Sequence, residues 1–177
     1  MKDNTRKNQS LPTTIEITTA LKRIARSEKY RFLVIHHEFS IQNPWSLLSE
    51  KTQPHSAWFD GTQQRILIGY EQTWTQTIQS AVPFQQAKER ANLLFDQIYE
   101  LGTPKESPLL FAGFAFQPSS GPLTEAWKQW PTNHLFLPKI LIDHQTKTEK
   151  TIVSFSFQLP KKIIPEELSQ TISQTIS

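Results

Sequence analysis

The sequence predicts an α+β domain in which a mostly antiparallel sheet has helices packed on one side. Short apolar or alternating runs of residues indicate strands, and longer stretches with apolar residues three and four apart indicate amphipathic helices. An Asp-Gly pair between two strand-like runs indicates a hairpin. With 177 residues, of which 37% are hydrophobic and 11 are Phe, the chain is long enough to form one domain with a substantial core.

The first part of the chain divides into a lead-in and the beginning of the domain. Residues 1–12 are predicted to be a flexible lead-in that ends at Pro12, and residues 13–177 are predicted to form the domain. From Thr18 to Glu28 the apolar residues follow helical spacing opposite basic residues. Residues 32–35 then form a short apolar run that predicts a buried strand, which continues through residues 36–39.

The middle of the chain contains a predicted hairpin and a long predicted helix. A short helix is expected at 44–48, because Pro44 suits a first helical position. Residues 57–59 and 65–70 flank Asp60-Gly61, a pair that suits a tight turn. A single stripe predicts a helix over 84–101, which Gly102 would cap, and its members are Phe84, Ala87, Ala91, Leu94, Phe95, Ile98 and Leu101.

Three strands and a helix are predicted in the last third of the chain. Residues 109–116 are nearly all apolar, so this strand is expected to be covered on both faces. The strand at 135–143 contains Pro138, which predicts an edge or a bulge there. It is expected to pair with the alternating strand at 151–158 through a turn at 145–150. A final helix is expected from Pro165, with Leu168, Ile172 and Ile176 on one face.

Composition and charge exclude several classes of function. With no Cys, the chain has no disulfides, thiol nucleophiles or Cys-ligated metals. No apolar run is long enough to suggest a membrane span, and residues 1–14 do not resemble a secretory signal, so we expect a cytoplasmic protein. Eight basic residues oppose three acidic ones within residues 1–31, and they are Lys2, Arg6, Lys7, Lys22, Arg23, Arg26, Lys29 and Arg31.

This basic stretch allows two interpretations, a contact with nucleic acid or a solvated tail followed by the polar face of a helix. No aromatic residues alternate with the charges as a stacking platform would require, so the second is favoured. Nucleic-acid binding that is lost on removal of residues 1–12 would support the first.

The histidines do not form a recognisable catalytic pattern. His36 and His37 alternate in a predicted strand, so only one can face a given site, and Glu38 and Glu50 add no metal-ligand spacing. We expect one partly buried and one exposed histidine there. His134 and His144 flank a predicted strand about ten residues long, which would keep them roughly 30 Å apart.

Other possible sites are equally incomplete. Ser119-Ser120-Gly121 lacks the strand–Ser–helix context of hydrolases and is interpreted as a turn. Trp127 and Trp130 could form a ring-stacking platform, although a short amphipathic turn that covers a sheet edge is favoured. The sequence therefore predicts no catalytic, cofactor-binding or metal-binding residue.

The order of several motifs resembles the N-terminal part of the isochorismate synthases, which are chorismate-utilising enzymes. The resemblance runs from about residue 30 to 160, with Ala112 where the family usually has a glycine. It is carried by Pro44-Trp45-Ser46-Leu47-Leu48, Ala57-Trp58-Phe59-Asp60-Gly61, Ile66-Leu67-Ile68-Gly69, Leu110-Phe111-Ala112-Gly113-Phe114-Ala115-Phe116, Trp127-Lys128-Gln129-Trp130-Pro131 and Leu135-Phe136-Leu137-Pro138.

The resemblance implies a fold, a reaction and a missing part. It implies the fold of the N-terminal part of a chorismate-utilising enzyme, acting in menaquinone or siderophore biosynthesis. In that family a lysine base activates water for attack on the chorismate ring, a glutamate acid assists loss of the original hydroxyl, and further glutamates hold Mg²⁺. These groups belong to a C-terminal chorismate-binding region, and Lys161 and Lys162 lie in the wrong context to match the lysine.

Two further expectations follow from this resemblance. The chain would be truncated before its catalytic region, inactive alone and without bound Mg²⁺, and it would need that region in cis or as a separate chain. Alternatively, it would be a non-catalytic binding or interaction module derived from the same fold.

Overall fold

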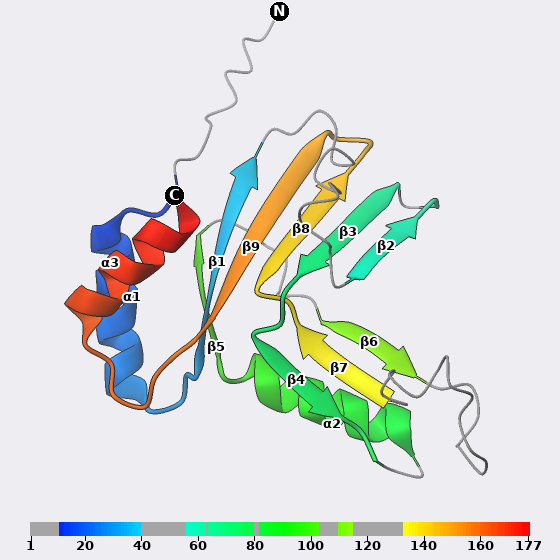
Figure 1. Cartoon of the computed structure of the whole chain (residues 1–177), viewed down its shortest axis with the longest axis horizontal. Helices are drawn as coiled ribbons and strands as arrows, with labels where there is room; N and C mark the ends of the chain where they lie inside the picture. Colours follow the sequence, from blue (N-terminus) through cyan, green and yellow to red (C-terminus); the bar gives the residue numbers. More distant parts are fainter. Residues whose placement is uncertain (1–10, 40–55, 63, 80–81, 103–109, 115–132) are drawn as a thin grey trace, which may run out of the picture.

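A computed structural model describes residues 11–39, 56–62, 64–79, 82–102, 110–114 and 133–177 (Figure 1). Within these ranges the elements follow one another as α1 (Thr14–Ser27), β1 (Phe32–Phe39), β2 (Ser56–Asp60), β3 (Arg65–Tyr70), β4 (Trp74–Thr77), α2 (Pro83–Phe95), β5 (Ile98–Gly102), β6 (Phe111–Phe114), β7 (Asn133–Leu137), β8 (Ile140–Gln145), β9 (Lys150–Gln158) and α3 (Pro165–Ile176).

The strands form two sheets, which confirms the predicted α+β class and the mostly antiparallel pairing. The larger sheet has six strands in the order β2-β3-β8-β9-β1-β5, and the smaller has three in the order β4-β7-β6. Only β1 and β5 pair in parallel among the described strands. The β2–β3 hairpin around Asp60-Gly61 and the β8–β9 pair are both present as predicted.

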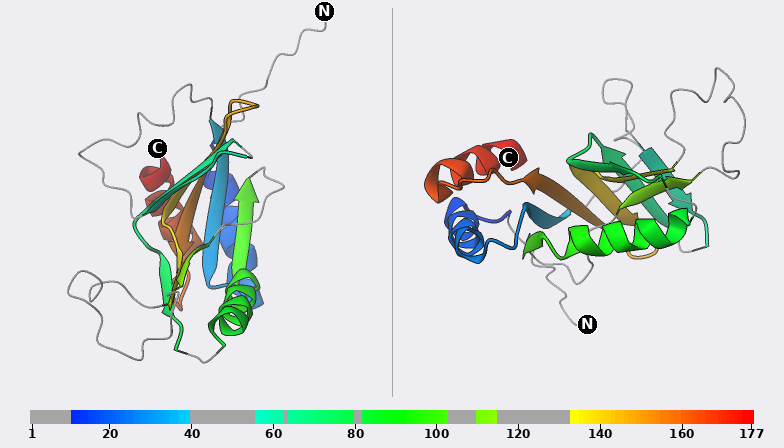
Figure 2. Two further views of the ribbon diagram at one scale, coloured as in Figure 1. Left: turned by 90° about the vertical axis from the view of Figure 1, so that its right-hand side faces the viewer. Right: turned by 90° about the horizontal axis from the view of Figure 1, so that it is seen from below.

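The central strand β1 is buried on both faces, and each face packs against different helices. Leu33 and Ile35 join a core cluster with residues of α1 and α3. The alternate side chains, Phe32 and Val34, pack instead with Leu94 of α2 and with Leu137 of β7. Helices α1 and α3 therefore cover one face of the larger sheet, and α2 lies on the opposite side, next to the smaller sheet (Figures 1 and 2).

Helix α1 begins four residues earlier than its apolar pattern predicts. Thr13 caps it, because the Thr13 side chain accepts a hydrogen bond from the Glu16 amide while the Glu16 carboxylate accepts one from the Thr13 amide. The burial of Ile17 adds a turn to the apolar face. Leu11, within the predicted lead-in, also packs against this core cluster.

Helices α1 and α3 are antiparallel neighbours joined by polar side chains along their contact (Figure 1). Thr14 Oγ1 lies 2.9 Å from Ser173 Oγ, and Thr18 Oγ1 donates to Ser169 Oγ over 2.8 Å. Ile172 and Ile176 of α3 lie in the core cluster that α1 shares, as the predicted apolar face of α3 requires.

The predicted helix over 84–101 is wrong in its last third, because the helix ends at Phe95 and residues 98–102 form strand β5. Parallel pairing of β5 with β1 satisfies the backbone of the outer edge of β1 and buries Ile98 beside Phe32. These gains outweigh the helical spacing of the sequence. Gly102 does not cap a helix, and instead has a φ of 103° next to His36.

The predicted strand at 135–143 is two strands that belong to different sheets. The chain leaves the smaller sheet after Leu137 and enters the larger one at Ile140. Pro138 is fully buried in the connection between β7 and β8, so it follows the end of one strand rather than forming the predicted edge or bulge within a single strand.

The expectation that the apolar strand at 109–116 is covered on both faces is wrong for its described part. Strand β6 is an edge strand of the smaller sheet, and its residues Ala112 and Gly113 are exposed. The short helix expected at 44–48 lies outside the described residues.

Candidate functional site

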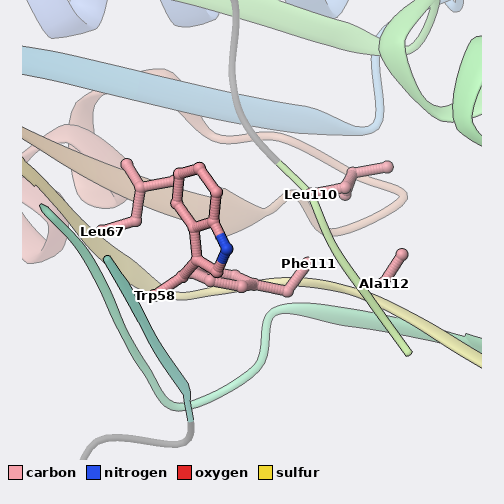
Figure 3. A pocket seen from close by; sticks show the side chains of 5 residues that line it. All are labelled: Trp58, Leu67, Leu110, Phe111 and Ala112. Atoms are coloured by element: carbon pink, nitrogen blue, oxygen red, sulfur yellow. The ribbon is translucent and has the colours of Figure 1, made fainter. Parts of the chain in front are cut away.

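An apolar cavity of about 260 Å³ lies where the two sheets meet. Its walls come from the β2–β3 hairpin on one side and from β6 with the residue before it on the other (Figure 3). The lining residues are Trp58, Leu67, Leu110, Phe111 and Ala112. Trp58 and Leu67 are register partners, so they project from the same face of the larger sheet.

A glycine in β3 permits the close approach of the two sheets beside this cavity. A Cβ on Gly69 would lie 2.9 Å from the Phe111 ring and 2.9 Å from Ser56 Oγ. Phe111 also stacks on Phe136, with ring centroids 5.3 Å apart and an interplanar angle of 14°. Phe111 is thereby held in place as a fixed wall, while Trp58 is 48% exposed at the mouth.

The charged residues nearest to the cavity bind each other. Asp143 pairs in register with Leu67 and is buried, and its carboxylate accepts two hydrogen bonds from Arg65. Nε donates to Oδ1 over 2.8 Å, and Nη2 donates to Oδ2 over 2.5 Å. This bidentate geometry occupies the guanidinium, so the cavity wall offers apolar contact rather than a free cation.

Three hydrogen-bonded side chains, those of Ser154, His36 and Glu100, span β9, β1 and β5 on the face of the larger sheet that carries the cavity. His36 Nδ1 lies 2.8 Å from Ser154 Oγ, and His36 Nε2 lies 3.2 Å from Glu100 Oε2. Because a carboxylate only accepts, Nε2–H donates to Glu100 and the neutral ring accepts from the Ser154 hydroxyl. Burial lowers the pKa of His36, and the nearby Glu100 opposes this effect.

This Ser–His–Glu order is that of a hydrolase triad, but the geometry favours a structural role. Ser154 is only 5% exposed and lies in the middle of β9, directly between Leu141 and His36. A nucleophile must reach a substrate, typically from a sharp turn beside oxyanion-stabilising amides. These three side chains therefore join β9, β1 and β5 rather than forming an active site.

The other described histidines each make contacts of their own. The expectation that one residue of the His36–His37 pair is exposed is wrong, since both are buried and His37 packs edge-on to Phe39. His134 lies in β7 of the smaller sheet and His144 in β8 of the larger one. His134 contacts Thr75 Oγ1 through Nε2 at 3.1 Å, and His144 contacts Thr151 Oγ1 through Nδ1 at 2.8 Å.

The remaining candidates among the described residues do not line the cavity. Glu38 pairs with Lys150 at 3.5 Å across neighbouring strands. Lys161 and Lys162 are exposed in the segment between β9 and α3. The predicted features at Glu50, Ser119–Gly121, Trp127 and Trp130 lie outside the described residues.

The described residues do not fit a Mg²⁺ site. No three or more His, Asp or Glu side chains among them are grouped so that they could hold a metal ion. Magnesium in proteins is bound mainly by carboxylates together with water or substrate oxygens. Here Asp143 is taken by Arg65, and Glu100 contacts His36.

Sequence reasoning identified Trp58 and Phe111 within motifs but did not predict that they share a cavity. Their strands are more than 50 residues apart and belong to different sheets. It also missed the contact of His36 with Glu100, because Glu100 was assigned to a helix. The signal that could have revealed it is the alternation of Ile98 and Glu100 before Gly102.

None of the described helices has the length and apolar character that a membrane crossing requires. No curated protein matches the sequence. A family model described as chorismate binding enzyme matches residues 19–177. The match spans both sheets, all of β1 to α3 and most of α1. The chain therefore belongs to the chorismate binding enzyme family.

Proposed function

We propose that this chain is the N-terminal portion of an isochorismate synthase-like enzyme and that it does not convert chorismate by itself. The family match over residues 19–177 supports the chorismate-utilising class. The Trp127-Lys128-Gln129-Trp130-Pro131 and Phe136-Leu137-Pro138 motifs support the isochorismate synthase type. The product would serve menaquinone or siderophore biosynthesis.

The observation that carries the proposal is the open apolar cavity beside an exposed edge strand. Chorismate is a dicarboxylate, and a site for it needs cationic or polar donors. The described part of the cavity wall is instead apolar and includes Trp58, Leu67 and Phe111, and the adjacent Arg65 is engaged by Asp143. Such a surface suits the apolar side chains of another protein region rather than the substrate.

The partner that we propose for this surface is the C-terminal chorismate-binding region of the same enzyme type, in cis or as a separate chain. The resemblance assigns the lysine base, the glutamate acid and the Mg²⁺ ligands to that region. The described residues supply the scaffold beside it: the edge of β6 and the cavity lined by Trp58 and Ala112. No step of the reaction is assigned to a residue of this chain.

The test is to measure isochorismate formation from chorismate with Mg²⁺. We expect no turnover above a no-protein control for this chain alone, and turnover when a chorismate-binding region is co-expressed with it. The double variant Trp58→Ser/Ala112→Glu changes two cavity residues and should reduce the restored activity by about tenfold or more, since a charge placed in an apolar contact is strongly disfavoured.

A matched control changes exposed residues of the same kinds on α1. Ile15 is 78% exposed and Ala25 is also exposed, so Ile15→Ser/Ala25→Glu should leave the restored activity unchanged. Equal losses in both double variants would contradict a role for the cavity. Turnover by the chain alone would contradict the proposed function itself.

A separate measurement distinguishes the proposed enzyme portion from the alternative, a non-catalytic binding or interaction module. A docking surface that lacks its partner should bind a hydrophobic fluorescent dye, because Trp58 and Phe84 are 48% and 69% exposed. A monomer that melts cooperatively without binding the dye would favour the stand-alone module.

A further inference from the structure

The fold gathers exposed basic residues from two distant segments at one corner of the molecule. The backbone amide of Leu159 donates to the Arg31 carbonyl over 2.8 Å, which brings the segment after β9 next to the beginning of β1. Figure 1 shows this corner at the lower left, where α1 ends and the chain turns toward α3. The basic corner consists of Arg23, Arg26, Lys29, Arg31, Lys161 and Lys162, all of them exposed.

The positive charge of this corner is largely uncompensated. Residues 22–31 and 159–167 hold seven Lys or Arg and three Glu, an excess of four, whereas the whole chain has a net charge of only +3. Lys22 pairs with Glu166 at 2.8 Å. None of the six cations of the basic corner makes a carboxylate ion pair within the described part of the chain.

Intramolecular electrostatics do not explain the position of Lys161 and Lys162. They precede the N-terminus of α3, where the helix dipole disfavours positive charge. Arg26 lies one helical turn beyond Lys22, so it extends the positive surface from the Lys22–Glu166 pair toward these lysines. Three exposed like charges thus come from α1 and from the segment before α3, and the Lys22–Glu166 pair joins the two helices.

An apolar side chain lies within this corner. Ile164 occupies the N-cap position of α3 and is 46% exposed, two residues after Lys162. An apolar centre with a charged rim is the usual composition of a protein-binding surface. Stacking of nucleic-acid bases is not offered by Tyr30, because its ring packs edge-on to Tyr99 and lies beneath Lys29 Nζ.

We propose that the basic corner binds an acidic segment of a partner protein, with an apolar side chain of that segment against Ile164. Planar guanidinium groups at Arg23, Arg26 and Arg31 suit carboxylates. The corner belongs to the α1–α3 side of the larger sheet, whereas the cavity opens on the opposite face between the two sheets. The proposal is therefore independent of the catalytic partner.

The test uses the full chain and a short fluorescent peptide of Glu-Glu-Leu repeats, with binding followed by anisotropy at about 50 mM salt, where screening is moderate. The variant Arg26→Gln/Lys161→Gln/Lys162→Gln should weaken binding by about tenfold, given the modest energy of each exposed ion pair. The control Lys88→Gln/Arg90→Gln/Lys147→Gln removes the same number of exposed charges elsewhere and should leave binding unchanged.

Two further arms test the identity of the partner. The variant Ile164→Ser should weaken binding of the Glu-Glu-Leu peptide but not of a Glu-Glu-Ser peptide. Equal weakening by the two triple variants would overturn the proposal, since it would indicate only a general effect of net charge. Tighter binding of single-stranded RNA, or of vesicles that contain anionic lipid, than of the Glu-Glu-Leu peptide would also overturn it. Because no chorismate is involved, the result does not depend on the proposed function.

Discussion

His36 and Ser154 lie directly opposite each other on β1 and β9, with Nδ1 of the imidazole 2.8 Å from the serine hydroxyl. On the other side the same ring contacts Glu100 of β5. One buried side chain thus joins an antiparallel and a parallel neighbour of the central strand. This contact makes the stability of the larger sheet dependent on pH.

Stability should fall as the pH drops below the ordinary histidine pKa of 6.5. Burial lowers the pKa of His36, so the unfolded chain takes up a proton before the folded chain does. The stabilisation is present above pH 6.5 and is lost as the pH falls through the folded-state pKa, by at most about 1.4 kcal/mol per pH unit for one proton. Urea unfolding at a series of pH values measures this slope.

Two variants should change that slope in opposite directions. His36→Asn removes the titrating ring and should make the slope shallower. Glu100→Gln removes the group that raises the pKa of His36, so the slope should become steeper and extend to lower pH. His37 and His134, whose pKa values are also lowered by burial, remain in both variants. An unchanged slope in His36→Asn would show that the dependence arises elsewhere.

Gly102 should be intolerant of a side chain. Its φ of 103° disfavours other residues, and a Cβ would lie 2.3 Å from the His36 carbonyl oxygen. Gly102→Ala should therefore destabilise the fold by about 2 kcal/mol or more by disturbing the β1–β5 pairing. Gly113→Ala is the matched control, because a Cβ there meets nothing within 4 Å, and its effect should stay within about 0.5 kcal/mol. Equal losses of unfolding free energy would contradict the steric explanation.

Removal of one member of the Arg65–Asp143 pair should lower the unfolding free energy more than removal of both members. Arg65→Met leaves the 5% exposed Asp143 carboxylate without its bidentate donor, and should lower the unfolding free energy by about 2 to 3 kcal/mol. Arg65→Met/Asp143→Leu replaces both charges with apolar side chains and should recover part of this loss. A double variant less stable than Arg65→Met would indicate that the pair itself supplies most of the energy.

The contact between α1 and α3 should depend on apolar packing rather than on its ion pair. Ile172 is 1% exposed in the core cluster shared by the two helices, so Ile172→Ala should cost about 3 kcal/mol. Lys22→Gln breaks the Lys22–Glu166 pair, whose side chains are more than half exposed, and should leave the unfolding free energy nearly unchanged. Thermal or urea unfolding of both variants distinguishes the contributions, and a reversed order would contradict this account.

The sequence was sufficient to predict elements whose pattern depends on local geometry. The β2–β3 hairpin is recognisable because Asp60 ends β2 opposite Arg65, Gly61 begins the connection, and the Asp60 carboxylate accepts from the Thr62 amide. Helix α3 is recognisable because Leu168, Ile172 and Ile176 share one face. The family resemblance likewise depended on short motifs in order, and the family match agrees with it at the level of chorismate-utilising enzymes.

The elements that were mispredicted depend on pairing between distant residues. Ile98 and Leu101 fit a helical stripe, yet they form part of β5, because pairing with β1 satisfies the backbone groups at its edge. Phe84 and Phe95 fit the same stripe but remain exposed, since only Ala87 and Leu94 of α2 are buried. The cavity could not be predicted for the same reason. Trp58 and Phe111 belong to different sheets, and the chain passes from one sheet to the other at Pro138.

The most direct test of the central claim is a time course of chorismate with Mg²⁺, followed by chromatographic detection of isochorismate. We expect no product from this chain alone at any protein concentration, and product when a chorismate-binding region is supplied with it. Isochorismate formed in proportion to the concentration of the chain alone would contradict the account, because it would show that this chain contains the catalytic groups.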